Sequence, residues 1–210
     1  MHAMNTFDEI GLVSRLTELP KPLRLAFAVA CASRMARPYR AGQDHLILGA
    51  PAIVDDTLNR IWDFAVGGPA ADWARTERDL TALIPDGDDQ LGPAHFIVDD
   101  ALAATAYAVR TAVAGDAQEA AFCSRRAYEA VDQFAQRTIT ATSLDADVER
   151  TLLADPVVQA ELSRQARDLA TLEQVTEGAE SAAITALRSS AASEDLIPLD
   201  DLNTWLSGAS

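Results

Sequence analysis

The sequence predicts an all-α fold: a single-domain bundle of about eight to ten helices packed around a buried central helix at about residues 93–114. Three observations favour this fold. Alanine is abundant, while aromatic residues make up only 6% of the chain. The alternation of apolar and polar residues that is typical of strands is almost absent, and apolar residues recur at helical spacing instead. We expect one domain over residues 1–210, with the tail at about 192–210 loosely attached.

The first two helices are predicted from the signals at their ends. Thr6 and Glu9 match a capping box, in which a hydroxyl and a carboxylate satisfy the free N–H groups of a first turn, and this predicts a helix to about residue 19. The next helix is expected over about residues 21–36. Pro38 should end it, because a proline pushes the preceding residue out of helical conformation.

Apolar spacing and turn residues place the next elements. A third helix is expected over about 51–65, and the Gly67-Gly68-Pro69 run should terminate it. A fourth helix is expected over about 71–83, before a loop at 85–93 that is rich in proline, glycine and aspartate.

The segment 93–114 is predicted to be the centre of the domain. Drawn as a helix, it is apolar on nearly every side, and its acidic and basic residues are Asp99, Asp100 and Arg110. A helix of this kind is normally buried. Its row of alanines would let neighbouring helices approach closely.

The rest of the chain is also predicted to be helical. Asp116 and Glu119 suggest a second capping box that starts a helix to about residue 138. Asp155 followed by Pro156 is a strong helix start, since it places a capping residue before a first-turn proline. The later helical segments are expected at about 144–153, 156–176, 178–191 and 196–206.

The charge of the chain limits its partners. There are 32 acidic and 17 basic residues, a net charge of −15, so nucleic acid and membrane surfaces are not expected as partners. Cys31 and Cys123 form no C-x-x-C pair and are expected to be buried free thiols. No signal peptide is recognisable, and we expect a cytoplasmic protein.

The candidate site residues are polar groups within the predicted helices. His95 and Asp99 stand four residues apart, a spacing that can orient an imidazole against a carboxylate, but no E-x-x-H ligand pair is present and we expect no metal or cofactor. Asp100 should be substantially buried and therefore needs hydrogen-bond donors. We expect it to pair with Arg34, Arg24 or Tyr39 and so to fix how the second helix docks. This interpretation makes Asp100 structural and assigns no catalytic residue.

Several separated segments together resemble one protein family, the YjaG-like bacterial proteins of the domain of unknown function 416 family. The similar segments are Arg34-Met35 with Tyr39, Leu58 to Asp63 with Trp62, Ile84-Pro85 with Asp88-Asp89, Asp100-Ala101, and Asp155 to Val158 with Glu161. The resemblance covers about residues 15–190. It departs at Asp63, where the family has glutamate, and at the spacing before Pro38. It implies a cytosolic all-helical domain and brings no established activity, cofactor or catalytic residue.

The leading functional interpretation is a non-catalytic protein–protein interaction module that forms a homodimer through an alanine-rich helix face. Two alternatives stay open. One is an immunity or antitoxin-like inhibitor of a basic protein, because residues 141–210 carry 13 acidic and 4 basic side chains, a net charge of −9. The other is an enzyme or metal-binding protein with a carboxylate-centred site. That site would bring Asp100, Asp99, His95 and Asp63 within about 5 Å of one another.

Overall fold

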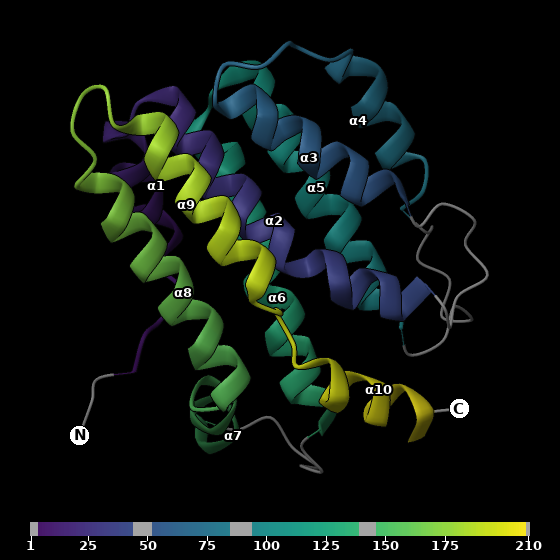
Figure 1. Cartoon of the computed structure of the whole chain (residues 1–210). Helices are drawn as coiled ribbons and strands as arrows, with labels where there is room; N and C mark the ends of the chain where they lie inside the picture. The colour runs from purple at the N-terminus through teal and green to yellow at the C-terminus, as the bar shows by residue number, and fades with distance from the viewer. Residues whose placement is uncertain (1–3, 44–51, 85–93, 139–145, 209–210) are drawn as a thin grey trace.

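The structure is a computed structural model that describes residues 4–43, 52–84, 94–138 and 146–208, and within these it contains ten helices and no strand (Figure 1). The predicted all-α bundle is confirmed. The predicted loop at 85–93 lies outside the described residues. The helices are α1 (Glu9–Glu18), α2 (Lys21–Gln43), α3 (Ala52–Ala65), α4 (Trp73–Thr81), α5 (His95–Ala114), α6 (Ala117–Thr138), α7 (Ala146–Leu153), α8 (Pro156–Glu173), α9 (Glu180–Ser193) and α10 (Leu199–Gly208).

Two helices form the centre of the bundle. The prediction that α5 is buried is correct: Val98, Leu102 and Val109 have no exposed surface. Helix α2 is just as central, and an unbroken buried run extends from Leu25 to Ala32. Helices α3, α5, α6, α8 and α9 all pack against α2, so it has almost no face left for solvent (Figure 1).

The alanine row of α5 is covered by the chain itself. Ala101, Ala104 and Ala108 are at most 1% exposed, because α2 and α6 pack closely against this helix. The alanine face of α5 is therefore used within the domain and is closed to a second copy of the chain.

The prediction that α2 ends before Pro38 is wrong. The helix continues to Gln43 with Pro38 inside it. A proline has no N–H, so it leaves the carbonyl of the residue four positions earlier, Arg34, without its helical hydrogen bond. The N–H of Leu196 donates to that carbonyl at 3.1 Å. A distant segment thus supplies the hydrogen bond that the proline removes.

The helix ends follow local rules in most places. The cap of α1 is Asp8 instead of the predicted Thr6, and its carboxylate accepts the N–H of Gly11. Asp155 caps α8 as predicted, accepting the N–H of Val157 at 2.8 Å. Gly115 ends α5 in the left-handed conformation with φ 65°, which glycine adopts without steric cost.

The C-terminal segment packs onto the bundle. Leu196, Ile197, Leu202 and Leu206 are at most 1% exposed, although the sequence suggested a loosely attached tail. Trp205 of α10 lies edge-on to Phe96 of α5 and Phe134 of α6. Contacts of this kind join segments far apart in the sequence, and helical spacing alone does not reveal them.

None of the helices in the described part of the chain is both long enough and apolar enough to cross a membrane.

Candidate functional site

A charged side chain lies in the middle of the bundle. Arg34 of α2 has no exposed side-chain surface. Its Nε and Nη2 donate to the two carboxylate oxygens of Glu161 on α8, at 3.0 and 2.9 Å, and its Nη1 donates to Asp168 Oδ2 at 2.8 Å. Burial disfavours the charged guanidinium, but these carboxylates outweigh burial and raise the pKa of Arg34. Arg34 therefore stays charged and joins α2 to α8.

A second layer of charges closes this cluster toward solvent. Arg167 donates to Asp168 Oδ1 at 2.8 Å and to both oxygens of Glu194, at 2.8 and 2.9 Å. The hydrogen bond that Arg167 donates to Glu194 is the main reason that the pKa of Arg167 is raised. Arg164 lies 3.7 Å from Glu161. Three guanidinium groups thus face three carboxylates, and the cluster is close to electrically neutral.

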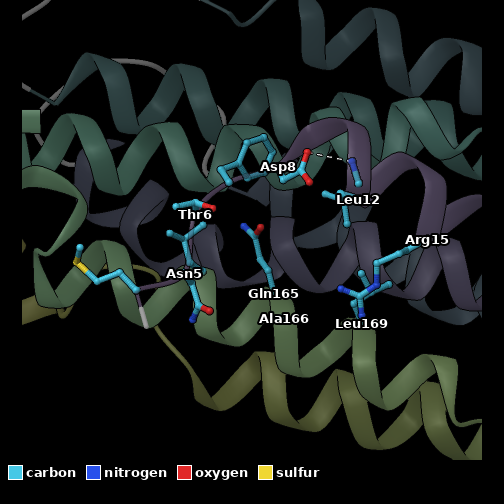
Figure 2. Close-up of a pocket in the computed structure, with 12 residues that line it drawn as sticks. Asn5, Thr6, Asp8, Leu12, Arg15, Gln165, Ala166 and Leu169 are labelled. Carbon is cyan, nitrogen blue, oxygen red and sulfur yellow. Dashed lines mark hydrogen bonds between the residues drawn. The ribbon is translucent and has the colours of Figure 1, made fainter. Parts of the chain in front are cut away.

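The cluster is connected to a surface groove by Gln165. The Nε2 of Gln165 donates to Glu161 Oε1 at 2.9 Å and to the carbonyl of Ser124 on α6 at 3.0 Å. Figure 2 shows Gln165 rising from α8 between the segment 4–8 and α1. It forms part of the floor of an open groove of about 370 Å³. The other lining residues are Met4, Asn5, Thr6, Phe7, Asp8, Gly11, Leu12, Arg15, Leu162, Ala166 and Leu169.

The walls of the groove are held in place by polar contacts to α8. The backbone of Asn5 exchanges two hydrogen bonds with the side chain of Gln159, each 2.9 Å long, and its side chain donates to Ser163. Arg15 of α1 donates to both oxygens of Glu173 at 2.7 and 2.8 Å (Arg15 is labelled in Figure 2). These contacts hold the segment 4–8 and α1 against α8.

Asp100 is buried as predicted, but its partners are not those predicted. Its carboxylate accepts from Arg126 at 3.2 Å and from Gln133 at 3.1 Å, both on α6. Arg34, one of the expected partners, pairs with α8 instead. Burial raises the pKa of Asp100 to about 7, against the opposing effect of Arg126. Asp100 therefore joins α5 to α6 and does not fix how α2 docks.

Arg24 and Tyr39, the other two expected partners of Asp100, also bond elsewhere. Arg24 donates to the backbone carbonyls of Leu16 and Leu19, and these hydrogen bonds stabilise the turn between α1 and α2. The hydroxyl of Tyr39 accepts from Gln43 at 2.7 Å, one turn further along α2. Burial raises the pKa of Tyr39 to about 12.

The remaining candidates do not meet in one site. Asp63 is 62% exposed and pairs with Arg188 of α9 at 2.8 Å, while Asp100 is 1% exposed and faces α6. No hydrogen bond joins His95 to Asp99, and the buried Nε2 of His95 has no partner among the described residues. The carboxylate-centred site that would bring Asp100, Asp99, His95 and Asp63 together is therefore not formed.

Trp62, another candidate, has a structural contact. Its indole N–H donates to Ser33 of α2 at 2.9 Å and so joins α3 to α2. In the described part of the chain, no group of three or more histidine, cysteine, aspartate or glutamate side chains is placed to hold a metal ion.

Comparison with known proteins decides the family. The model of the family described as protein of unknown function DUF416 matches residues 11–197. The chain belongs to the DUF416 family. A crystal structure of a DUF416 family protein from Shewanella baltica has the same fold, with a TM-score of 0.75 and 18% sequence identity over 86% of this chain and 93% of that one. No curated protein matches the chain.

Two of the residues that carried the resemblance to the DUF416 family contact each other. Arg34 and Glu161 belong to similar segments 127 residues apart, and they form the centre of the buried cluster. Asp168 and Gln165 were not among the predicted site residues. A signal for them exists, because residues 161, 165 and 168 are polar at helical spacing on the same side of α8 as buried leucines.

Proposed function

We propose that this protein is a cytoplasmic, non-catalytic interaction module, and that the groove between residues 4–8, α1 and α8 binds a basic segment of a partner protein. The observation that carries the proposal is the groove itself. Its lining combines apolar side chains, such as Leu12, Leu162 and Leu169, with polar side chains, such as Asn5, Arg15 and Gln165. A groove that offers both apolar surface and polar groups is the usual anatomy of a binding site for a peptide side chain or a short segment.

The distribution of charge supports a basic partner. Most arginines form ion pairs with carboxylates of the same chain. The net charge of −15 therefore comes from the acidic side chains that are not in such pairs. Helix α8, which forms one wall of the groove, belongs to the segment 141–210 with its net charge of −9. The resulting field attracts a positively charged segment and repels an acidic one. An inhibitor of a basic toxin would be one protein of this kind. The arginines in ion pairs are Arg15, Arg34, Arg37, Arg40, Arg75, Arg110, Arg125, Arg126, Arg164, Arg167 and Arg188.

Site-specific crosslinking in the native host tests the proposal. Ala166 is an exposed residue of α8 in the groove, so a photoreactive amino acid at this position should leave the fold intact. The matched control is the same amino acid at Ala186, an exposed alanine of α9 that does not line the groove. We expect an adduct from Ala166 that is absent from Ala186, with the crosslink in a basic segment of the partner.

A binding measurement with the identified partner completes the test. Ala166→Arg adds bulk and positive charge to the groove and should weaken binding at least about tenfold, whereas Ala186→Arg should not. An adduct with the mass of two copies of this chain would replace the proposed partner with a homodimer. Equal adducts from both positions, or a partner segment rich in acidic residues, would contradict the proposal.

A further inference from the structure

A second cavity lies where α4, the C-terminal end of α5 and the first turn of α6 meet. It is open to solvent, has a volume of about 540 Å³, and shares no lining residue with the groove of Figure 2. Its apolar lining comprises Trp73 and four small or medium side chains. Its polar lining comprises four carboxylates and one guanidinium. The lining residues are Ala71, Asp72, Trp73, Ala74, Glu77, Arg110, Val113, Ala114, Asp116 and Glu119.

Two buried polar atoms of the lining residues have no hydrogen-bond partner among the residues that the structure describes. Trp73 is 8% exposed, and its indole Nε1–H is buried without an acceptor. Glu119 Oε2 is buried without a donor. Leaving a buried donor or acceptor unsatisfied costs free energy, so native proteins rarely do so unless a ligand or water completes the site. Here one donor and one acceptor are left unsatisfied in the lining of the same cavity.

Glu119 is left over by an incomplete helix cap. The sequence predicts a capping box of Asp116 and Glu119, and Asp116 does accept the N–H of Gln118 at 2.9 Å. The Oε2 of Glu119 does not complete the box, because it bonds no backbone N–H. Burial raises the pKa of Glu119, and the nearby Asp116 and Glu77 add to this, whereas Arg110 opposes it. A cationic group in the cavity would stabilise the ionised form of Glu119 and lower its pKa again.

The charges of the cavity favour a cation. Arg110 is the basic side chain of the lining, and its Nε already donates to Glu77 at 2.6 Å. Asp72, Asp116 and Glu119 form no ion pair with an arginine of the described residues, whereas Arg110 pairs with Glu77. The exposed side chains of Val113 and Ala74 also line this cavity. They can contact the apolar part of a ligand while the carboxylates bind its cationic group.

We propose that this cavity binds a small primary amine that also carries a carbonyl or hydroxyl oxygen and an apolar substituent. The ammonium donates to Glu119 Oε2, and the neighbouring oxygen accepts the N–H of Trp73. Amino-acid amides, amino alcohols and the free N-terminus of a short peptide share this chemistry. The site is independent of the interaction module proposed above.

A set of three ligands tests the two contacts separately on the full-length protein. Leucinamide has both the ammonium and the carbonyl, isoamylamine lacks the carbonyl, and 4-methylpentanamide lacks the ammonium. We expect leucinamide to bind about tenfold more tightly than either of the other two, by calorimetry. Isoamylamine and 4-methylpentanamide then serve as probes of one contact each.

Two conservative variants assign the contacts. Trp73→Phe keeps an aromatic ring and removes the N–H. It should therefore weaken the binding of leucinamide about tenfold and leave the binding of isoamylamine unchanged. Glu119→Gln should weaken the binding of leucinamide and isoamylamine, which both carry the ammonium group, and leave the binding of 4-methylpentanamide unchanged. Trp205→Phe and Glu177→Gln make the same chemical changes outside the cavity and should leave all three affinities as they are.

An NMR measurement on the unmodified protein avoids dependence on variants. Each of the three tryptophans gives one indole N–H signal, and leucinamide should shift the signal of Trp73 and not those of Trp62 and Trp205. Two results would each overturn the proposal. One is a Trp73 signal that does not move at about 10 mM leucinamide. The other is equal binding of leucinamide and 4-methylpentanamide.

Discussion

Arg34 of α2 and Glu161 of α8 are 127 residues apart in the sequence and form a two-pronged ion pair in which neither side chain has any exposed surface. Asp168, about two turns further along the same face of α8, accepts a hydrogen bond from the Nη1 of the guanidinium at 2.8 Å. The pairing is therefore complete only when both carboxylates and the arginine are present. Removing one charge leaves the others buried without compensation.

Arg34→Met tests this interdependence. Methionine fills much of the volume but leaves Glu161 and Asp168 buried without a counter-charge, so the free energy of unfolding should fall by about 3–5 kcal/mol. Urea denaturation measures the change. The control is Arg37→Met on the same helix, where a half-exposed ion pair with Asp195 is lost and the change should be below about 1 kcal/mol.

A third variant covers the case in which Arg34→Met does not fold. Replacing Arg34, Glu161 and Asp168 together with Met, Leu and Leu removes all three charges, and most of the lost stability should return. Equal losses for Arg34→Met and Arg37→Met would show that the buried cluster does not stabilise the fold in the way described.

The stability of the protein should depend on the ionisation of Asp100. Burial raises its pKa from 3.8 to about 7 in the folded chain. Between these two values the native state holds a proton that the unfolded state has released, so this group makes the free energy of unfolding fall as the pH rises through that window. An NMR titration of the Asp100 carboxyl carbon should give a midpoint near 7, and a midpoint near that of a free aspartate would contradict the assignment.

Asp100→Asn checks the same effect by stability. The amide cannot ionise, so the variant should gain stability relative to the natural protein as the pH rises from about 4 to about 7. A difference in unfolding free energy that stays constant over this range would mean that Asp100 keeps the same charge in the folded and unfolded states.

Pro38 is expected to help hold the C-terminal segment, because it leaves the carbonyl of Arg34 without a helical donor and the N–H of Leu196 bonds to it instead. Pro38→Ala restores an N–H that can bond the Arg34 carbonyl within α2, and this N–H would compete with that of Leu196. The backbone amide of Leu196 should then exchange with solvent at least about tenfold faster, which hydrogen exchange read by NMR would detect. Unchanged protection at Leu196 would show that the carbonyl serves both donors equally well.

The two cysteines should not react in the folded protein. Cys31 and Cys123 have no exposed surface, and burial raises the pKa of both thiols, that of Cys123 to about 12. Since the thiolate is the reactive form, a disulfide reagent should modify them only as fast as the chain opens, and denaturant should accelerate the reaction. Ser181→Cys supplies an exposed thiol on α9 as a positive control. Rapid modification of Cys31 or Cys123 without denaturant would contradict the prediction.

Local chemistry determined much of this fold. The burial of α5 follows from its apolar composition, its end at Gly115 follows from glycine's freedom at positive φ, and the start of α8 follows from the side chain of Asp155. Each of these depends on residues within one or two turns, so helical spacing and capping rules predict it. The DUF416 family could also be recognised from short segments without the structure.

The long-range pairings were decided only by the tertiary structure. The sequence showed that Asp100 needs donors, but only the packing of α6 on α5 supplies Arg126 and Gln133. It indicated a helix end at Pro38, but the N–H of Leu196 lets α2 continue. The physical reason is the same in both cases. A buried polar group must find a partner, and many side chains are chemically suitable, so the arrangement of the helices in space selects which one it meets.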